Sequence, residues 1–170
     1  CDSFSVQFAC GKKTASQLEG ATEFQAVEAG KVVFTGIVDD FELRLGRDGA
    51  LAEITGRGMA GRLMDMQTLA AEYVTAQLED ILNAYVRPCG ITKIEADEMP
   101  PVAQFVVQTG ATCYQALAGF CRHSAEIFPR FLADGTLVLR KEAAGSSIRL
   151  GSEILTAQYV RNRYGVAARQ

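Results

Sequence analysis

Three glycines in the segment GRGMAG, Gly56, Gly58 and Gly61, follow the G-x-G-x-x-G pattern of dinucleotide-binding proteins. In those proteins the glycines let the backbone approach a pyrophosphate between parallel strands, and an acidic residue about twenty positions later binds the ribose. Glu79 and Asp80 lie near that distance. The strand expected before Gly56 belongs to an antiparallel hairpin, however. We therefore interpret the glycines as a bend at the end of a sheet, and we expect no cofactor.

Cys113, Cys121 and His123 could in principle bind a metal or catalyse thiol chemistry. The two cysteines are about two helical turns apart, so they share one face of a helix. Zinc sites usually take their thiolates in closely spaced pairs, and no fourth ligand is near in the sequence. We interpret both cysteines as small core residues and His123 as a surface residue. The sequence thus predicts no metal site and no catalytic residue.

Carboxylates cluster at three places in the chain. Adjacent residues of a strand point to opposite faces, so Asp39 and Asp40 are not expected to act together on one substrate. No spacing supports the carboxylate pair of a glycosidase. The other two groups, an adjacent pair on a predicted helix and a cluster in a predicted loop, are Glu79, Asp80, Glu95, Asp97 and Glu98.

Arginines and tyrosines form a small basic and aromatic cluster near the end of the sequence. Because the whole chain is acidic, we interpret this cluster as a surface or subunit contact rather than a nucleic-acid site. Its members are Tyr159, Arg161, Arg163, Tyr164 and Arg169.

The composition excludes several classes of function. The 170 residues include 17 Lys and Arg against 20 Asp and Glu, so the chain lacks the basic patch expected of a specific nucleic-acid-binding protein. The longest apolar runs are far shorter than the roughly 20 residues that span a bilayer, which predicts no membrane-spanning segment. Five cysteines, an odd number without framework spacing, indicate a reducing compartment.

A long antiparallel meander between Glu23 and Asp65 must position the three glycines and the Asp39–Asp40 pair. Apolar and polar residues alternate from Val32 to Leu45, as in half-buried strands. Arg47-Asp48-Gly49 has the composition of a tight hairpin turn, after which the alternation resumes. The glycines at positions 36, 56 and 58 favour bends or bulges. Phe4, Val6 and Phe8 at the start of the sequence indicate a further strand, so the chain reads as a piece of a longer protein.

After the meander, the spacing of the apolar residues changes from that of a strand to that of a helix. Between Leu69 and Val86, apolar residues form one helical stripe that Pro88 and Gly90 end. A short strand is expected from Ile91 to Glu95. The apolar members of the stripe are Val74, Leu78, Ile81, Leu82 and Tyr85.

A second helix is predicted near Ala111 to Ser124, with Thr109 as its N-cap. Asp134-Gly135 then marks another hairpin turn. The predicted fold class is therefore α+β, an antiparallel β-barrel-like unit with an inserted two-helix α+β segment. We expect the barrel over residues 1–66, the insert over 67–145 and further strands over 146–170. The buried stripe of the second helix is expected to contain Tyr114, Leu117, Ala118 and Cys121.

The order of these motifs resembles a known family. VVFTGIVDD, a charged hairpin and ITGRGMAGRLMD, followed by a helix ending in PCGI and a DGTLVL hairpin, resemble the baseplate hub proteins of contractile-tailed bacteriophages, including the Mu-like tail hub and late control protein D families. Related hubs serve in tailocins and contractile secretion systems.

The resemblance implies a structural protein of a phage or prophage, not an enzyme. It further implies a homotrimer that links the tail-tube and spike proteins in the virion tail baseplate, after assembly in the host cytoplasm. Residues 1–66 then correspond to the first hub barrel, and residues 146–170 return toward a second barrel.

Two alternatives from other classes stay open. An OB-like barrel binding module should carry interleaved basic and aromatic residues on one face, whereas the meander offers Phe34 and Phe41 among mixed charges. A small hydrolase would depend on His123, since the sequence contains one histidine.

Overall fold

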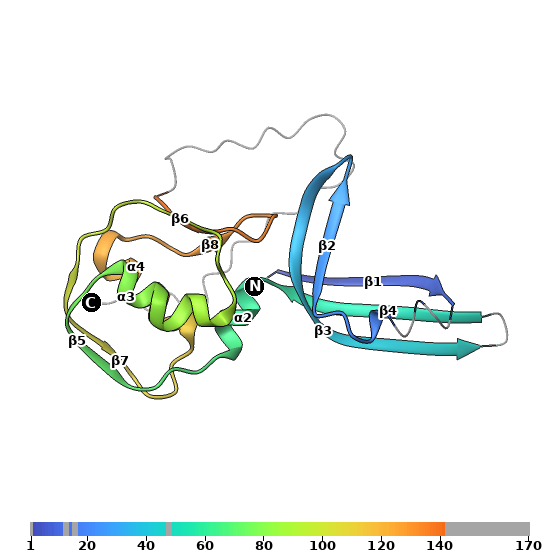
Figure 1. Cartoon of the computed structure of the whole chain (residues 1–170), viewed down its shortest axis with the longest axis horizontal. Coiled ribbons are helices and arrows are strands. Elements are labelled where there is room, and N and C mark those ends of the chain that lie inside the picture. The colour runs from blue at the N-terminus through green and yellow to red at the C-terminus, as the bar shows by residue number, and fades with distance from the viewer. Residues whose placement is uncertain (1, 12–13, 15–16, 47–48, 142–170) are drawn as a thin grey trace, which may run out of the picture.

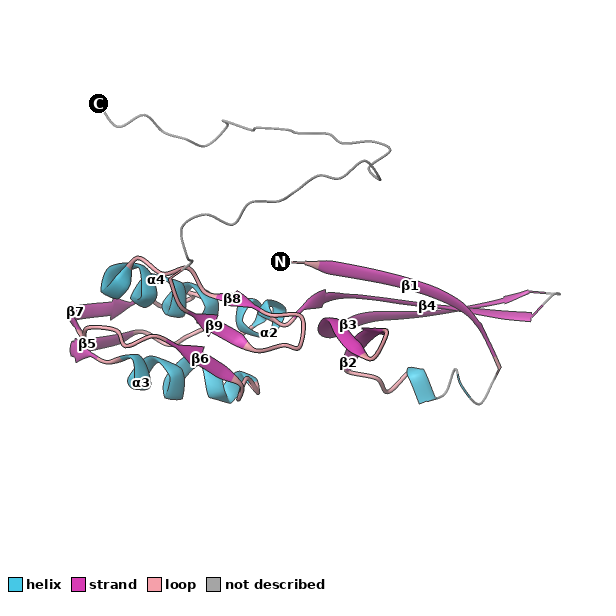
Figure 2. Ribbon diagram, turned by 90° about the horizontal axis from the view of Figure 1, so that it is seen from above, coloured by secondary structure: helices cyan, strands magenta, loops and turns pink. Residues whose placement is uncertain are grey.

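The computed structural model describes residues 2–11, 14, 17–46 and 49–141. It has an α+β fold in which a curled antiparallel sheet forms a half-barrel next to a body of helices and short strands (Figures 1 and 2). The predicted fold class is confirmed, although the barrel-like unit is a half-barrel. The strands expected over 146–170 and the basic and aromatic cluster lie outside the described residues.

The half-barrel is a sheet of four antiparallel strands in the order β1-β4-β3-β2. The predicted hairpin is confirmed, because Gly46 pairs with Gly49 at the end of the β3–β4 ladder, and Gly49 has a φ of 130°. Strands β1, β3 and β4 extend away from the body (Figure 2). The strands are β1 (Ser3–Cys10), β2 (Glu23–Glu28), β3 (Lys31–Gly46) and β4 (Gly49–Gly58).

Three phenylalanine rings lie together on one face of this sheet. Phe4 of β1 stacks on Phe24 of β2 with ring centroids 4.3 Å apart, although these strands are at opposite ends of the strand order. Phe34 of β3 completes the cluster at 5.5 Å from Phe4. The sheet must therefore be strongly curled, with these rings on its concave side. We call the face that carries the three rings the inner face and the opposite one the outer face.

Two glycines make this curl sterically feasible. Gly56 pairs with Phe4, and a Cβ on Gly56 would lie 2.0 Å from the carbonyl oxygen of Ile37. A Cβ on Gly36, the partner of Phe24, would lie 2.3 Å from a backbone oxygen of β4. Both distances are far below van der Waals contact. A residue other than glycine at either position would force neighbouring strands apart.

A β-bulge divides strand β3 into two halves. Val38 pairs with Gly56 and Asp40 with Thr55, so Asp39 is an extra residue. Side chains of a strand alternate between its two faces, so one extra residue exchanges the faces on which odd-numbered and even-numbered residues lie. Even-numbered residues from Phe34 to Val38 face inward, and odd-numbered ones do so from position 41 onward.

The body has its own hydrophobic core, in which Leu63, Leu117 and Phe120 are fully buried. Strands β5 and β7 pair antiparallel, and β6 pairs parallel with β9, which also pairs antiparallel with β8. In chain order the elements are α2 (Ala60–Asp65), β5 (Ala71–Ala76), α3 (Leu78–Ile81), the π-helical η1 (Leu82–Val86), the 3₁₀ turn η2 (Arg87–Cys89), β6 (Ile94–Ala96), β7 (Val102–Val107), α4 (Cys113–Ala125), β8 (Arg130–Phe131) and β9 (Leu137–Leu139).

The helix predicted from Leu69 to Val86 is wrong in its first half. Residues 71–76 form β5 instead, and Val74 is 87% exposed rather than buried. Pairing with β7 selects the strand, in which Ala71 and Tyr73 face inward. The helical region starts after Gln77, whose backbone N–H donates to the carboxylate of Asp80 at 2.9 Å. From that point the predicted stripe is confirmed, because Ile81, Leu82 and Tyr85 are buried.

Two other boundaries differ from the prediction. Helix α4 is capped by Thr112 rather than Thr109, since the Thr112 hydroxyl accepts from the Gln115 N–H at 3.1 Å and the Gln115 side chain accepts from the Thr112 N–H. This is a capping box. The short strand starts at Ile94, and Ile91 packs in the core. In α4, Leu117 and Cys121 are buried as predicted, whereas Tyr114 and Ala118 are half-buried.

The predicted second hairpin is confirmed. Strands β8 and β9 pair around Asp134-Gly135, and the Gly135 N–H donates to the Leu132 carbonyl at 3.0 Å. The Asp134 carboxylate accepts from the Thr136 N–H at 3.0 Å, which closes the turn. Gly135 has a φ of 83°, as the turn requires.

The burial of Cys121 generates a testable prediction. Because burial raises the pKa of this thiol to about 12, Cys121 should not react with a thiol reagent in native buffer and should react in denaturant. Cys121→Ser should lower the free energy of unfolding by about 1–3 kcal/mol, since a hydroxyl replaces the sulfur in an apolar site. Mass spectrometry of labelled peptides would measure the first effect. Rapid native labelling of Cys121 would contradict the packing of α4.

The close approach at Gly56 predicts a contrast between two neighbouring glycines. Gly56→Ala should destabilise the protein by roughly 1–3 kcal/mol or more, as overpacking does. Gly58→Ala is the matched control, because its Cβ would lie 3.7 Å from the nearest atom, in Asp2. Urea unfolding of both variants measures the difference. Equal stability of the two variants would show that the curl does not depend on Gly56.

Candidate functional site

The glycine motif lies at the junction of the half-barrel and the body. Gly56 and Gly58 are in β4 and Gly61 is in α2. Strand β4 is antiparallel to both of its neighbours, which confirms the antiparallel setting expected from the sequence. Glu79 and Asp80 lie on α3, where Glu79 binds Arg87 and Asp80 caps the helix. A Cβ on Gly56 would clash with the backbone of β3, and this steric requirement explains why glycine occupies that position of the motif.

The thiols of the body are buried. Cys89, Cys113 and Cys121 are free cysteines in the core, and burial raises the pKa of the Cys89 thiol as it does that of Cys121. A thiol with a raised pKa is a poor nucleophile at neutral pH because little thiolate is present. His123 is exposed on α4, with its Nδ1 2.7 Å from the Gly119 carbonyl oxygen. The described residues contain no cluster of three or more potential metal ligands.

Asp39 and Asp40 have different partners. Arg57 donates to both oxygens of Asp39, at 2.7 and 2.8 Å, and to both oxygens of Asp65, at 2.9 and 2.8 Å. Asp40 instead accepts from the Thr55 hydroxyl at 3.4 Å. Arg57 thus ties the bulge of β3 to the last residue of α2. Sequence analysis missed this cluster, because its members meet only after the chain has folded.

The guanidinium of Arg57 determines the ionisation of its partners. Its hydrogen bonds lower the pKa of Asp39 and of Asp65, and those two carboxylates raise the pKa of Arg57. A second ion pair, between Arg62 of α2 and Glu23 of β2, also joins the body to the half-barrel. The junction is therefore held by two arginines that bind acidic residues from different elements.

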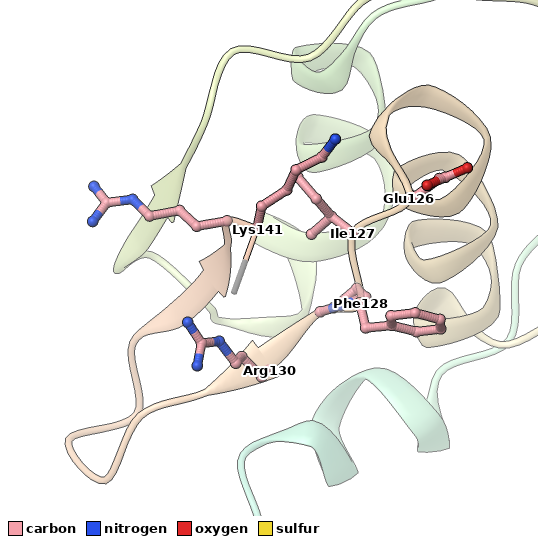
Figure 3. A pocket seen from close by; sticks show the side chains of 7 residues that line it. Glu126, Ile127, Phe128, Arg130 and Lys141 are labelled. Atoms are coloured by element: carbon pink, nitrogen blue, oxygen red, sulfur yellow. The ribbon is translucent and has the colours of Figure 1, made fainter. Parts of the chain in front are cut away.

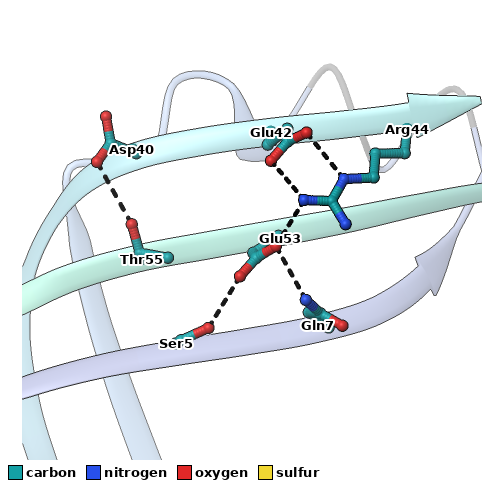
Figure 4. A network of polar contacts seen from close by, with 7 residues as sticks. All are labelled: Ser5, Gln7, Asp40, Glu42, Arg44, Glu53 and Thr55. Atoms are coloured by element: carbon teal, nitrogen blue, oxygen red, sulfur yellow. Dashed lines mark hydrogen bonds and ion pairs between the residues drawn. The ribbon is translucent and has the colours of Figure 1, made fainter.

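The outer face of the half-barrel carries a polar network (Figure 4). Glu53 of β4 accepts hydrogen bonds from Ser5 at 3.1 Å and from Gln7 at 2.9 Å, both in β1. Arg44 binds Glu42 through two hydrogen bonds of 2.8 and 2.9 Å and lies 3.5 Å from Glu53. Cross-strand contacts of this kind fit a face that water covers.

The inner face is apolar but incompletely covered. Val6 and Phe41 flank the buried Ile54, and Phe8 and Leu43 flank Ala52. Toward the tip of the β3–β4 hairpin the apolar side chains become exposed, since the exposed fraction is 37% at position 43 and 73% at position 45. Apolar surface of this kind on a sheet indicates an interaction site. We regard the half-barrel, with this face and with the sheet edges that have no partner strand in the described part of the chain, as the candidate functional site.

A separate hollow of about 410 Å³ lies beside the second hairpin of the body (Figure 3). Phe128 at its rim is 71% exposed. Arg140 in its wall is paired with Glu95 at 2.9 Å and lies 3.7 Å from Asp97, so nearby acidic residues balance its charge. The wall combines no nucleophile with a base, and it does not suggest a reaction. Its residues are Glu126, Ile127, Phe128, Pro129, Arg130, Arg140 and Lys141.

The fold is shared with two solved proteins. The tail protein from Neisseria meningitidis MC58 is 19% identical, with a TM-score of 0.61 over 80% of this chain and 40% of that one. The 43 kDa tail protein of prophage MuSo2 from Shewanella oneidensis is also 19% identical, with a TM-score of 0.61 over 91% of this chain and 51% of that one. This chain has the fold of these tail proteins.

The chain thus spans 40% and 51% of the lengths of the two tail proteins. No protein-family model and no curated protein matches the sequence. No helix in the described part of the chain has the length and apolar character that a membrane span requires.

The Arg57 cluster predicts how stability depends on pH. Because folding lowers the pKa of Asp39 and Asp65, their stabilising effect should be complete above the unfolded pKa of about 4 and be lost as the pH falls through the folded values. Arg57→Gln should therefore lower the melting temperature at pH 7, and the difference from the wild type should narrow below pH 4. Arg122→Gln, on the exposed side of α4, is the control and should show no such narrowing. A difference that stays constant with pH would argue against ion pairing as its cause.

Proposed function

We propose that this chain is part of a baseplate hub of a phage or prophage tail, where it links the tail-tube and spike proteins. The observation that carries the proposal is the fold shared with the prophage MuSo2 tail protein over 91% of this chain. The order of sequence motifs supports the same assignment independently. In this role the protein is structural rather than catalytic, and it resides in the tail baseplate after assembly in the host cytoplasm.

The half-barrel suggests how such a subunit assembles. Strands β1 and β2 are the two edges of the sheet, and each leaves one row of backbone N–H and C=O groups without a partner strand among the described residues. Edges of this kind readily pair with other chains. We propose a homotrimeric ring in which the half-barrel of one subunit contacts a different surface of the next. Such a heterologous contact closes into a ring when the rotation between subunits permits.

The assembly can be tested on the full-length protein. Light scattering should give a trimer, and electron microscopy should show a ring, with more than about 1,000 Å² buried at each contact. Val27→Asp, at a 58% exposed position of β2, should weaken the trimer because it places a charge at the edge of the sheet. Leu69→Asp, at an 84% exposed position outside the described strands, is the matched control and should leave the trimer intact.

The contrary result is also specific. A full-length protein that stays monomeric at high micromolar concentration and captures neither a tail-tube nor a spike protein would exclude the hub assignment. The OB-like binding module would then become the better hypothesis. At present the structure favours it less, since Phe34 packs against Phe4 and Phe24 instead of standing among basic residues.

A further inference from the structure

The outer half of β3 has an open edge. Strand β2 pairs with β3 from Lys31 to Ile37, whereas residues 40–46 have β4 on one side and, among the described residues, no partner strand on the other (Figure 1). Successive residues of an antiparallel strand direct their N–H and C=O groups to alternate sides. Half of the backbone groups in residues 40–46 therefore point toward this edge, which can accept an added strand.

The two faces of this segment differ in chemistry. Phe41, Leu43 and Leu45 lie on the inner face, and the last two are exposed. Glu42 and Arg44 lie on the outer face, where both side chains are more than half exposed and bind each other (Figure 4). Proteins commonly protect a free edge with charged side chains, proline or a bulge. Here the two charges have opposite signs, so a strand that presents the same charges in reverse order would complement them.

The same segment of a second molecule has this reverse order. When two copies run antiparallel about a two-fold axis through Leu43, residue 42 of each copy lies opposite residue 44 of the other, and residue 41 lies opposite residue 45. Glu42 then faces the partner's Arg44, and Phe41 faces the partner's Leu45. Each of these pairs occurs twice because of the symmetry. Cross-strand pairs of opposite charge and pairs of apolar residues both stabilise a sheet.

The charges also select the register. Apolar residues must share one face across the new pair, so alternative registers differ by steps of two residues. Sliding one strand by two residues brings either the two Glu42 side chains or the two Arg44 side chains directly opposite each other. Like charges in that position are destabilising. The register centred on Leu43 is therefore the one that the charged residues favour.

Arg44 can bind its own Glu42 and that of a second copy together. Its Nε and Nη2 donate to Glu42 at 2.8 and 2.9 Å, and Nη2 also lies 3.5 Å from Glu53. A guanidinium has five N–H donors, so Nη1 is available to donate across the edge. The four side chains at positions 42 and 44 of the two copies would then alternate in charge.

We propose that residues 40–46 pair with the same residues of a second molecule about a two-fold axis at Leu43. The pairing joins the two four-stranded sheets into one continuous sheet and covers the exposed Leu45 with the partner's Phe41. Such a contact is isologous, because each copy contributes the same surface. It follows one short strand, so it is small and reversible and requires a high protein concentration. It uses neither β1 nor β2, and at low micromolar concentration it leaves the proposed ring unchanged.

Disulfide cross-linking tests the register. Leu43→Cys, in a chain that also carries Cys1→Ser and Cys10→Ser, should form a covalent dimer on air oxidation, because residues directly opposite in a sheet lie within disulfide range. Leu45→Cys in the same background is the matched control. Two cysteines at position 45 would lie about 14 Å apart along the strands and should not cross-link. Gel electrophoresis without reductant measures both outcomes.

Charge reversal tests the cross-strand ion pairs. Glu42→Arg and Arg44→Glu each give a strand with two like charges, so each variant alone should raise the dimer dissociation constant by about ten-fold or more in sedimentation equilibrium. An equimolar mixture of the two variants should recover dimerisation, because every charged pair across the edge is then of opposite sign. Arg122→Glu, exposed on α4, is the control and should change nothing.

Two kinds of result would overturn the inference. A chain that stays monomeric near millimolar concentration, or that cross-links through position 45 as readily as through position 43, would show that the segment does not pair in this way. Dimerisation that persists in both charge variants, or that is lost in Val27→Asp, would assign the association to another surface. The Val27→Asp arm also separates this contact from the proposed ring, which that substitution should weaken.

Discussion

The half-barrel depends on the contact between two glycines and two phenylalanine rings. Gly36 and Gly56 have no side chain, so backbone oxygens of the neighbouring strands approach to distances that a Cβ would forbid. The ring of Phe34 lies closest to Gly36 and the ring of Phe4 lies closest to Gly56, and Phe4 also stacks on Phe24. Stacked aromatic pairs contribute about 0.5–1.5 kcal/mol beyond the burial of their area. The curl, the position of the sheet edges and the inner face all follow from these contacts.

The bulge and the Arg57 cluster connect this curled sheet to the body. Asp39 leaves the ladder of β3, and its carboxylate becomes available to Arg57, which also binds Asp65 at the end of α2. The body then adds a core of its own, built around Phe120. These ion pairs fix the direction in which the exposed part of the sheet extends from the body.

Much of the fold could be predicted from the sequence because its signals are local. Alternating residues predicted β1 to β4, and Asp-Gly predicted the turn at Gly135. Strand β5 was missed because Val74 happened to continue the helical stripe of Leu78 and Ile81, and the long-range pairing with β7 decides its conformation. The Thr112 capping box has a local signature, Thr-x-x-Gln, so the start of α4 is also encoded in the sequence.

The candidate site was less accessible to sequence analysis. The sequence suggested that glycines 36, 56 and 58 bend the sheet, but the bulge position decides which side chains line each face, and it is set by pairing between β3 and β4. The same holds for Arg57, whose two partners lie 18 and 8 residues away in the chain. Neither feature has a periodic signature.

The bulge at Asp39 also limits how the length of this protein can vary. Asp39 is one extra residue in β3. Because of it, Phe41 and Leu43 lie on the same face as Ile54 and Ala52, the residues of β4 with which they pair. Insertion or deletion of a single residue next to Asp39 would turn Phe41 and Leu43 outward and bring Glu42 inside. Changes of two residues preserve the facing. A single-residue change at this point therefore requires a second bulge to restore the facing, whereas the hairpin can lengthen at its tip by any number of residues per strand.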